Sequence, residues 1–431
     1  MNLALIVFLI IFILMFVLRM PIPTGMMAAC VFYFLITGTD VKMVAQQTMG
    51  QLYTNTTIIA VPLFIFAANV MNSGKITEMI FDFSKGIVGR FRGGLGHVNV
   101  LASLIFSGMT GSAIADASGL GKMEIQAMRD EGYDDGFSCA ITAASATIGP
   151  IFPPSIPMVI YAMLSGASVG ALFMGGMVPG VLLAIALMVY IAFIAKKRNY
   201  PRSAQLTMRA YLKRTFLAIP SLLTPVILLL GIYTGVMTPT EAGAIAGLYA
   251  LLVAIFAYRV LKWEDFKQVL VDTVQSTGSV SLMIGAAASI SYIVAKEQIA
   301  AKVGELILSM TDNKYLFLLI VNITILILGM FIDTSVIQVV FIPILLPLVN
   351  TLGIDLVHFG LVVVFNMMIG LSTPPFGMLL FITSGISGTP LKDVVKEIWA
   401  PIVAMLVVLV VITYIPEVVL FLPRMFLNYV G

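Results

Sequence analysis

Charged residues are scarce in this sequence, and their scarcity excludes most soluble folds. They make up 10% of the 431 residues, whereas hydrophobic residues make up 60%, and the mean hydropathy is +1.06. Soluble globular domains carry about 25% charged residues. The net charge is only +3, and Lys and Arg lie in loops without forming the basic patch of a nucleic-acid-binding protein. Water is therefore not the main solvent of this chain.

Cysteine and histidine are also rare. Cys30 and Cys139 both lie in apolar segments, which predicts two buried thiols and neither a disulfide framework nor a thiolate metal site. His97 and His358 are far apart and have no partners at ligand spacing, so no transition-metal site is expected. No phosphate-binding loop occurs in the sequence, because the glycine-rich segment 90–96 lacks a preceding strand and a Lys-Ser/Thr ending. We therefore expect no ATP site and no organic cofactor.

Long apolar runs dominate what is present. At least eight stretches approach or exceed the roughly 20 residues that a spanning helix needs, among them Leu3–Leu18, Leu172–Ala195 and Pro401–Phe421. The first run has no preceding basic residue and no small-residue cleavage site after it, so we interpret it as a retained helix rather than a signal peptide. The pattern predicts an all-α polytopic membrane protein.

One segment of the chain recurs 221 residues later. Ile148-Gly149 and Pro153-Pro154 return as Ile369-Gly370 and Pro374-Pro375, and Gly108-Met109 returns as Gly329-Met330 at the same spacing. Internal repeats of this kind are typical of secondary transporters. The sequence therefore predicts two inverted repeats, residues 1–195 and 215–431, joined by a basic connector, residues 196–214.

The distribution of basic residues predicts the orientation of these halves. The connector holds the densest basic segment of the chain, which should be cytoplasmic by the positive-inside rule. If the halves are inverted, the first helix runs inward and ends at Arg19 in the cytoplasm, so both termini should face the periplasm. The basic residues of the connector are Lys196, Lys197, Arg198, Arg202, Arg209, Lys213 and Arg214.

Each half contains two interruptions of its apolar runs. Polar tips at 107–112 and 329–335 predict re-entrant hairpins at about 95–128 and 315–350, and the Pro-Pro loops predict broken helices at about 136–166 and 357–386. Unpaired backbone groups cannot face lipid, so these breaks should line one central polar site. Freed carbonyls and Ser or Thr hydroxyls are hard oxygen ligands that suit Na⁺, and helix N-termini suit an anionic substrate.

The acidic residues inside apolar stretches are functional candidates with structural alternatives. Asp116 and Asp333 would each cost several kcal/mol in lipid, about 2.5–3.5 on insertion scales. Asp333 could instead serve as a helix N-cap, and Asp116 could simply bond a neighbouring hydroxyl. Glu241 follows a turn, where a structural cap is favoured over a role in transport. Polar side chains beside the breaks are further candidates, although hydroxyls often bond their own backbone: Ser103, Ser107, Thr110, Ser112, Ser145, Thr147, Ser155, Asn366, Ser372 and Thr373.

The motifs together resemble the large membrane subunit of tripartite ATP-independent periplasmic (TRAP) transporters. They are Ser107–Ser112 with Ala-Ile-Ala-Asp116, Ile148–Ser155, Thr238–Ala242 and Gly329–Asp333, and the resemblance covers nearly the whole chain. It implies an elevator-type carrier in the bacterial inner membrane, driven by a Na⁺ gradient. It also implies two partners: a periplasmic substrate-binding protein and a small four-helix membrane subunit, here expected as a separate chain.

The resemblance also implies positions for the ligands. Two or more Na⁺ ions would bind around the hairpin tips and the Pro-Pro loops, and the substrate would lie between them. The implied Na⁺ ligands are Ser103, Ser107, Gly108, Thr110, Ser145, Gly149, Gly329, Asp333, Thr334, Gly370 and Thr373. The implied substrate-binding residues are Ser112, Asp116, Ser155 and Asp333.

The sequence leaves alternatives open for both the substrate and the class of protein. The tip Asp333–Val336 lacks the proline found in many dicarboxylate relatives, so the sequence is most similar to the sialic-acid branch, with a C4-dicarboxylate or another organic acid as alternatives. A divalent-anion symporter that needs no binding protein would share the paired hairpins. An intramembrane aspartyl protease could use Asp116 and Asp333, but no Gly-x-Gly-Asp segment is present, and no enzyme activity is expected.

Overall fold

The computed structural model describes residues 3–18, 20–54, 56–72, 74–203, 207–310 and 313–431, and these residues form helices and no strands. Six helices in this part of the chain are long and apolar enough to cross a membrane, and eight shorter apolar helices accompany them. The prediction of an all-α polytopic membrane protein is confirmed. The predicted cytoplasmic residue Arg19 lies outside the described residues.

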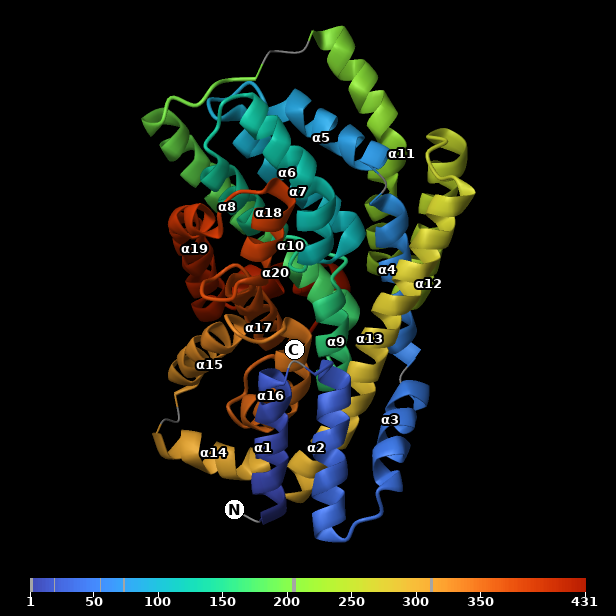
Figure 1. Cartoon of the computed structure of the whole chain (residues 1–431), viewed down its shortest axis with the longest axis vertical. Helices are drawn as coiled ribbons and strands as arrows, with labels where there is room; N and C mark the ends of the chain where they lie inside the picture. Colours follow the sequence, from blue (N-terminus) through green and yellow to red (C-terminus); the bar gives the residue numbers. More distant parts are fainter. Residues whose placement is uncertain (1–2, 19, 55, 73, 204–206, 311–312) are drawn as a thin grey trace.

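The first three helices of the chain lie at one end of the molecule, and the fifth lies at the opposite end (Figure 1). Helix α2 starts after Pro21, carries Pro23 in its first turn, and ends at Gly38 with φ of +67°. The first turn of a helix tolerates proline because the backbone N–H groups there have no partner within the helix. Glycine readily adopts the left-handed conformation of the C-terminal cap. The elements are α1 (Leu3–Val17), α2 (Ile22–Thr37), α3 (Lys42–Thr54), η1 (Thr56–Ile59), α4 (Ala60–Met71) and α5 (Gly74–Val88).

Helices α6 (Gly94–Thr110) and α7 (Ala113–Asp130) form the first hairpin, and α8 (Asp135–Ala146) and α9 (Ile156–Ser165) are the arms of the first broken helix. We refer to α6–α9 as the first module. It is followed by α10 (Val169–Lys197), the longest helix of this half.

Four further helices and a π-helical turn lead from α10 to the second hairpin: α11 (Met208–Tyr233), α12 (Pro239–Leu252) with η2 (Val253–Ala257), α13 (Trp263–Lys296) and α14 (Ile299–Met310). Because α11 begins at Met208, the irregular connector is shorter than the predicted 196–214; residues 204–206 lie outside the described part. Lys213 and Arg214 are helical, and Arg214 pairs with Asp82 of α5 at 2.8 Å. Basic residues can lie at the end of a helix as well as in a loop. The charge pattern alone therefore could not show where the connector ends and α11 begins.

The second module consists of the hairpin α15 (Lys314–Gly329) and α16 (Thr334–Thr351) and the broken helix α17 (Leu356–Leu371) and α18 (Met378–Ser387). Helices α19 (Leu391–Tyr414) and α20 (Glu417–Leu427) follow. The apolar run Pro401–Phe421 is therefore split at Ile415 and Pro416 rather than forming one helix. Pro416 has no N–H to continue the helical ladder.

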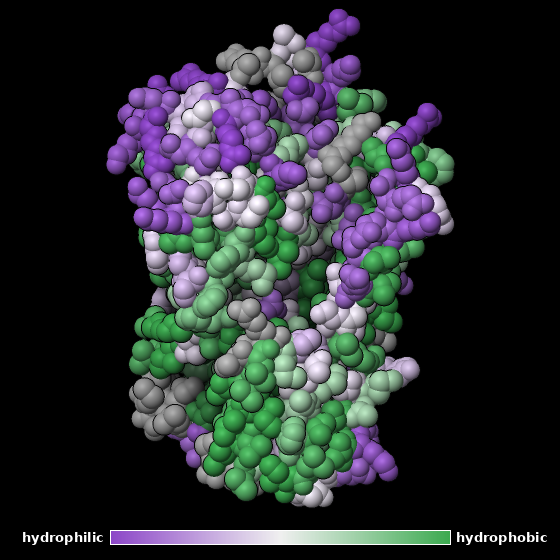
Figure 2. Space-filling view, viewed as in Figure 1, coloured by the Kyte–Doolittle hydropathy of each residue, from purple (hydrophilic) through white to green (hydrophobic). Residues whose placement is uncertain are grey.

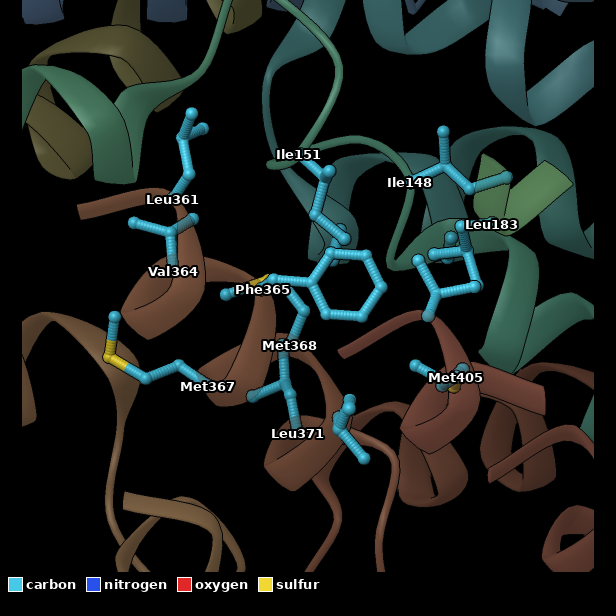
Figure 3. Packing of buried hydrophobic residues seen from close by; sticks show 14 of the residues in the cluster. Ile148, Ile151, Leu183, Leu361, Val364, Phe365, Met367, Met368, Leu371 and Met405 are labelled. Carbon is cyan, nitrogen blue, oxygen red and sulfur yellow. The ribbon is translucent and has the colours of Figure 1, made fainter. Parts of the chain in front are cut away.

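The two modules interlock across the molecule. Helix α9 of the first module packs against α16 and α17, and α18 of the second module packs against α7 and α8. Figure 3 shows part of the resulting core, to which Ile148 and Ile151 of the first Pro-Pro loop and Phe365, Met368 and Leu371 of α17 all contribute. Each broken helix is thus held by the hairpin of the other half.

The surface divides into apolar and polar regions. Figure 2 shows hydrophilic side chains gathered at the end near α5 and the start of α11, and hydrophobic side chains over α1 and α2 at the other end. Large hydrophobic side chains elsewhere are also exposed, such as Phe193 and Phe216, each 74% accessible. In water such exposure would be unfavourable, and it suits a surface covered by lipid.

Candidate ion and substrate site

The tip of the first hairpin packs directly on the first Pro-Pro loop. Helix α6 ends at Gly111, which has φ of +61°, and a Cβ there would lie 2.5 Å from the carbonyl oxygen of Pro154. A Cβ on Gly149 would lie 3.2 Å from the Ser112 backbone. Only glycine permits both the left-handed turn and this approach. The structure therefore brings together the predicted residues Ser112 and Gly149 and the loop that leads to Ser155.

Ser112 and Ser155 begin the two helices that start at this contact. The Ser112 hydroxyl accepts a hydrogen bond from the Ala115 amide at 3.4 Å, and the Ser155 hydroxyl accepts one from the Met158 amide at 3.2 Å. Ser155 also donates to the Pro150 carbonyl, which ties the two ends of the loop. Two helix N-termini thus meet beside the loop, and their partial positive charges favour an anion.

A buried polar network extends from the hairpin into the first module. The Ser103 hydroxyl donates to Ser145 at 3.2 Å, Ser145 donates to the Asn99 side-chain oxygen at 2.6 Å, and Asn99 donates to Glu124 at 2.9 Å and to Thr142 at 2.7 Å. All five side chains are buried. Ser103 and Ser145, predicted as Na⁺ ligands, are thus in contact.

Asp116 lies beside this network and is 1% exposed. Neither of its carboxyl oxygens has a hydrogen-bond partner, and the same holds for Oε1 of Glu124. The Ser103 side chain, which hydrogen-bonds to Ser145, also interacts with the Asp116 carboxyl group, so the alternative considered from the sequence, an Asp116 carboxylate beside a neighbouring hydroxyl, has a structural basis. An unsatisfied buried carboxylate is costly and requires an explanation.

The other predicted hydroxyls donate to their own helices. Ser107 bonds the Leu104 carbonyl at 2.6 Å, Thr110 bonds that of Phe106 at 3.4 Å, and Thr373 bonds that of Ile369 at 2.6 Å. Donation to a carbonyl three or four residues back is common in membrane helices. It leaves the oxygen lone pairs free to accept, which is what a cation ligand needs. Gly108 lies between Ser107 and Thr110, against Pro225 of α11.

The second module repeats the close backbone contact in another form. A Cβ on Gly370 would lie 2.7 Å from Cα of Gly329, so the end of α17 touches the end of α15. Asp333 caps α16 by accepting a hydrogen bond from the Ser335 amide at 2.9 Å, and Thr334, 8% exposed, begins that helix. The predicted cap at Asp333 is confirmed. Because α9, headed by Ser155, packs against α16, headed by Asp333, the two clusters belong to neighbouring helices.

The sequence analysis missed several buried polar residues. Glu124 follows Asp116 by two helical turns on α7, and this spacing could have identified it. In the second module Asn366 donates to the backbone and side-chain oxygens of Asn322, each at 2.8 Å, and Asn322 donates to Thr413 at 3.0 Å. The sequence indicated Asn366 only by its position near the second Pro-Pro loop, and it did not indicate Asn322, because a single asparagine in an apolar helix carries no spacing signal.

The remaining candidates have structural roles. Glu241 forms a capping box with Thr238, accepting from its amide at 2.8 Å, so the favoured structural interpretation is confirmed. Cys30 and Cys139 are free and buried, as predicted. The His358 ring lies 2.9 Å from the Ile412 carbonyl. Within the described residues, no group of three His, Cys, Asp or Glu side chains could hold a metal ion.

A polar side of the structure lies at the base of the first hairpin, outside the apolar spans. Arg198 pairs with Asp134 at 3.0 Å and with Glu397 at 2.8 Å, and Tyr200 donates to Asp134 at 2.6 Å. Burial raises the pKa of the Tyr200 hydroxyl, and its hydrogen bond to Asp134 raises it further, so Tyr200 remains a donor at neutral pH. These contacts join α8, α10 and α19 at one end.

One cavity of about 250 Å³ lies at the base of the second hairpin, between α15, α17 and α20. Its walls carry charge of both signs, including Lys314, Asp355, Glu417 and Arg424. None of the site residues predicted from the sequence lines it.

Comparison with known proteins identifies the family. Residues 9–418 match the model of the tripartite ATP-independent periplasmic transporter, DctM component. The chain is 43% identical over 401 residues to the sialic acid TRAP transporter large permease protein SiaM of Vibrio cholerae, covering 93% of this chain and 94% of that protein.

More distant relatives agree with this result. The chain is 39% identical to the sialic acid TRAP transporter permease protein SiaT of Haemophilus influenzae, covering 94% of this chain and 66% of that longer protein. It is 37% identical to the C4-dicarboxylate TRAP transporter large permease protein DctM of Pseudomonas aeruginosa, covering 85% and 86%.

A solved structure shares the fold. The Alcanivorax borkumensis YdaH transporter superposes with a TM-score of 0.58 at 14% identity, covering 86% of each chain. The named relatives are transporter permeases rather than enzymes, in agreement with the sequence. The chain belongs to the DctM component family of tripartite ATP-independent periplasmic transporters and is a multi-pass large permease subunit.

Proposed function

We propose that this chain is the Na⁺-coupled carrier subunit of a transporter that imports an organic acid, with sialic acid as the preferred substrate. The observation that carries the proposal is the paired construction of the site: in each module a hairpin tip packs by a glycine contact against the end or loop of a broken helix. Backbone carbonyls and hydroxyls gather at both contacts. Oxygen-rich breaks in membrane helices are the usual sites of Na⁺ and anionic substrates.

Two Na⁺ sites follow from this construction. The first comprises Ser103, Ser107, Gly108 and Thr110 of the hairpin with Ser145 and Gly149 of the broken helix. The second comprises Gly329, Asp333 and Thr334 with Gly370 and Thr373. The hydroxyls at Ser107, Thr110 and Thr373 donate to backbone carbonyls and keep their lone pairs for a cation.

The substrate site lies between the modules, where α7, α9 and α16 begin. Ser112 and Ser155 cap the first two helices, and Asp333 caps the third. Helix N-termini offer backbone N–H groups and positive potential to a substrate carboxylate. The similarity to SiaM and SiaT favours sialic acid over the C4-dicarboxylates transported by the relatives named DctM.

The remaining features follow the same proposal. The chain lies in the bacterial inner membrane, with the basic connector in the cytoplasm and both termini in the periplasm. The hairpins and broken helices of its two inverted repeats form a transport domain, which moves against the scaffold helices by an elevator mechanism. A small four-helix membrane subunit covers part of the apolar surface, and a periplasmic binding protein delivers the substrate.

Uptake in proteoliposomes tests the proposal. The chain and its small partner would be reconstituted, and uptake of labelled sialic acid would be measured with and without the binding protein and an inward Na⁺ gradient. We expect uptake only when both are present. Uptake without the binding protein would indicate a conventional symporter. Uptake of C4-dicarboxylates instead of sialic acid would assign the chain to the C4-dicarboxylate branch of the family.

A further inference from the structure

Two of the long apolar helices, α10 and α19, are joined at one end by an ion pair. Both are long and apolar enough to cross a membrane, and they pack against each other. Arg198, which caps the C-terminal end of α10, donates to both carboxylate oxygens of Glu397 of α19, at 2.9 and 2.8 Å. The C-terminal end of α10 is therefore held beside the N-terminal end of α19, and the side chains around the ion pair form one surface region.

An exposed apolar stripe leads along α10 to this region. Ile185, Val189 and Phe193 follow one another at four-residue spacing, so they lie on one side of the helix, and each is at least 50% exposed. Lys197 is the next residue at the same spacing, and Lys196 precedes it; both are exposed. The exposed side of α10 therefore changes from apolar to basic within one helical turn.

Helix α19 repeats this arrangement from its N-terminal end. Lys392 and Lys396 are exposed and lie four residues apart. Trp399, Val403 and Val407 continue on the same side of the helix at spacings of three and four residues, and each is at least 50% exposed. Two neighbouring helices thus each carry an apolar stripe that ends on two lysines at the same end.

The four lysines leave an excess of positive charge around the ion pair. Among the residues that the structure describes, no ion pair involves Lys196, Lys197, Lys392 or Lys396. The carboxylates of Asp134 and Glu397 are both engaged by Arg198. Asp393 adds one exposed carboxylate beside Lys392. A negatively charged group from outside the chain would balance the remaining charge.

We propose that the joined ends of α10 and α19 form a binding site for an anionic phospholipid. Its phosphate lies among the four lysines, and its acyl chains lie along the two apolar stripes. Basic groups between membrane helices suit acidic lipid headgroups, and a tryptophan such as Trp399 suits the boundary between headgroups and acyl chains. A soluble anion would use the lysines but leave the stripes uncovered, and a zwitterionic lipid would bring an ammonium group to the lysines.

Fluorescence quenching in bilayers tests the site, because Trp399 lies one turn from Lys396 and the sequence contains only two tryptophans. Trp263→Phe in the full-length chain leaves Trp399 as the single tryptophan. Its fluorescence would be measured in phosphatidylcholine bilayers with a small, fixed fraction of brominated phosphatidylglycerol or brominated phosphatidylcholine. We expect stronger quenching by brominated phosphatidylglycerol, because the lysines concentrate this lipid beside Trp399. Equal quenching by the two lipids would overturn the proposal.

Two pairs of substitutions in this background separate a defined site from diffuse attraction. Lys196→Gln with Lys396→Gln should weaken the preference for phosphatidylglycerol by about fivefold for each lysine removed. Lys213→Gln with Lys262→Gln removes the same charge from exposed positions on α11 and at the start of α13, and it should leave the preference unchanged. Equal losses in the two double variants would contradict a site at α10 and α19. If Lys196→Gln with Lys396→Gln does not fold, the comparison of the two brominated lipids decides the matter.

A soluble competitor distinguishes a lipid site from a phosphate site. Millimolar glycerol 3-phosphate carries the headgroup charge without acyl chains, so it should leave the quenching by brominated phosphatidylglycerol unchanged. Relief of the quenching would assign the lysines to a soluble phosphate and overturn the proposal. The measurements need neither Na⁺ nor an organic acid, so failure of sialic acid uptake would leave them unchanged.

Discussion

In the first module the buried polar network ends on the carboxyl group of Glu124, with the carboxyl group of Asp116 beside it, whereas in the second module it consists of Asn322, Asn366 and Thr413. The positions 221 residues after Asp116 and Glu124 are Ile337 and Leu345, both buried in α16. The two modules therefore share a backbone arrangement but differ in the charge inside it. A repeated fold can carry one ionisable site and one neutral site, because packing depends on shape and ion binding depends on the atoms placed there.

The bases of the two modules differ in the same direction. Arg198 at the first base binds Asp134 and Glu397, and the Glu397 side chain is only 15% exposed. At the second base, Arg424 pairs with Glu417, whose side chains are 43% and 65% exposed. The Arg198–Glu397 ion pair at the first base is thus more buried than the Arg424–Glu417 pair at the second.

The largest expected effect comes from the backbone contacts that the modules share. Gly370→Ala places a Cβ 2.7 Å from Cα of Gly329, which side-chain movement cannot relieve. We expect a destabilisation of about 1–3 kcal/mol and a strong loss of Na⁺-driven uptake. Uptake in proteoliposomes and thermal unfolding measure both effects.

Gly278→Ala is the matched control for this substitution, since a Cβ there meets nothing within 4 Å. Gly111→Ala tests the corresponding contact of the first module, with the added strain of φ at +61°. Normal uptake by Gly370→Ala would show that the second module does not need the close contact between Gly329 and Gly370. The two modules would then not share a required backbone contact.

An intermediate effect separates the two polar networks. Asn99→Ala removes the donor to Glu124 and the acceptor of Ser145, at a cost of about 2–3 kcal/mol. Asn322→Ala should cost about 1 kcal/mol, because Asn366 still donates to the backbone carbonyl of Asn322. Thermal unfolding followed with a thiol-reactive dye at the buried Cys30 and Cys139 measures the difference. Equal losses in the two variants would contradict the assigned difference in charge.

The smallest effect concerns the two bases. Arg198→Met should destabilise the chain by about 1 kcal/mol or less, and Arg424→Met by close to nothing, because exposed ion pairs are screened by water. The loss in Arg198→Met should shrink at high salt. Unfolding temperatures at low and high NaCl check this, and a larger effect for Arg424→Met would reverse the comparison.

Sequence reasoning identified the elements whose signal is local. Apolar length predicted the helices, Pro-Pro pairs predicted their breaks, and Thr238 with Glu241 predicted a cap. The same reasoning missed Asn99, Glu124 and Asn322, since a buried polar residue is recognised by its partners, and Glu124, Ser145 and Asn366 lie 25 to 46 residues away from theirs along the chain. It also joined residues 401–421 into one run. Hydropathy scores only the polarity of Pro416, whereas the helix is interrupted because Pro416 lacks a backbone N–H.

The sequence by itself determined that this chain is a membrane-embedded helical protein with two related halves and that polar breaks interrupt each half. Hydrophobicity and proline act locally, so their consequences can be inferred along the chain. Only the tertiary structure decided that α9 and α18 cross to the opposite module, that Gly329 meets Gly370, and that Asp116 is buried with Glu124 without a counter-charge. These features depend on contacts between distant segments, and burial and hydrogen bonding exist only after those segments have packed.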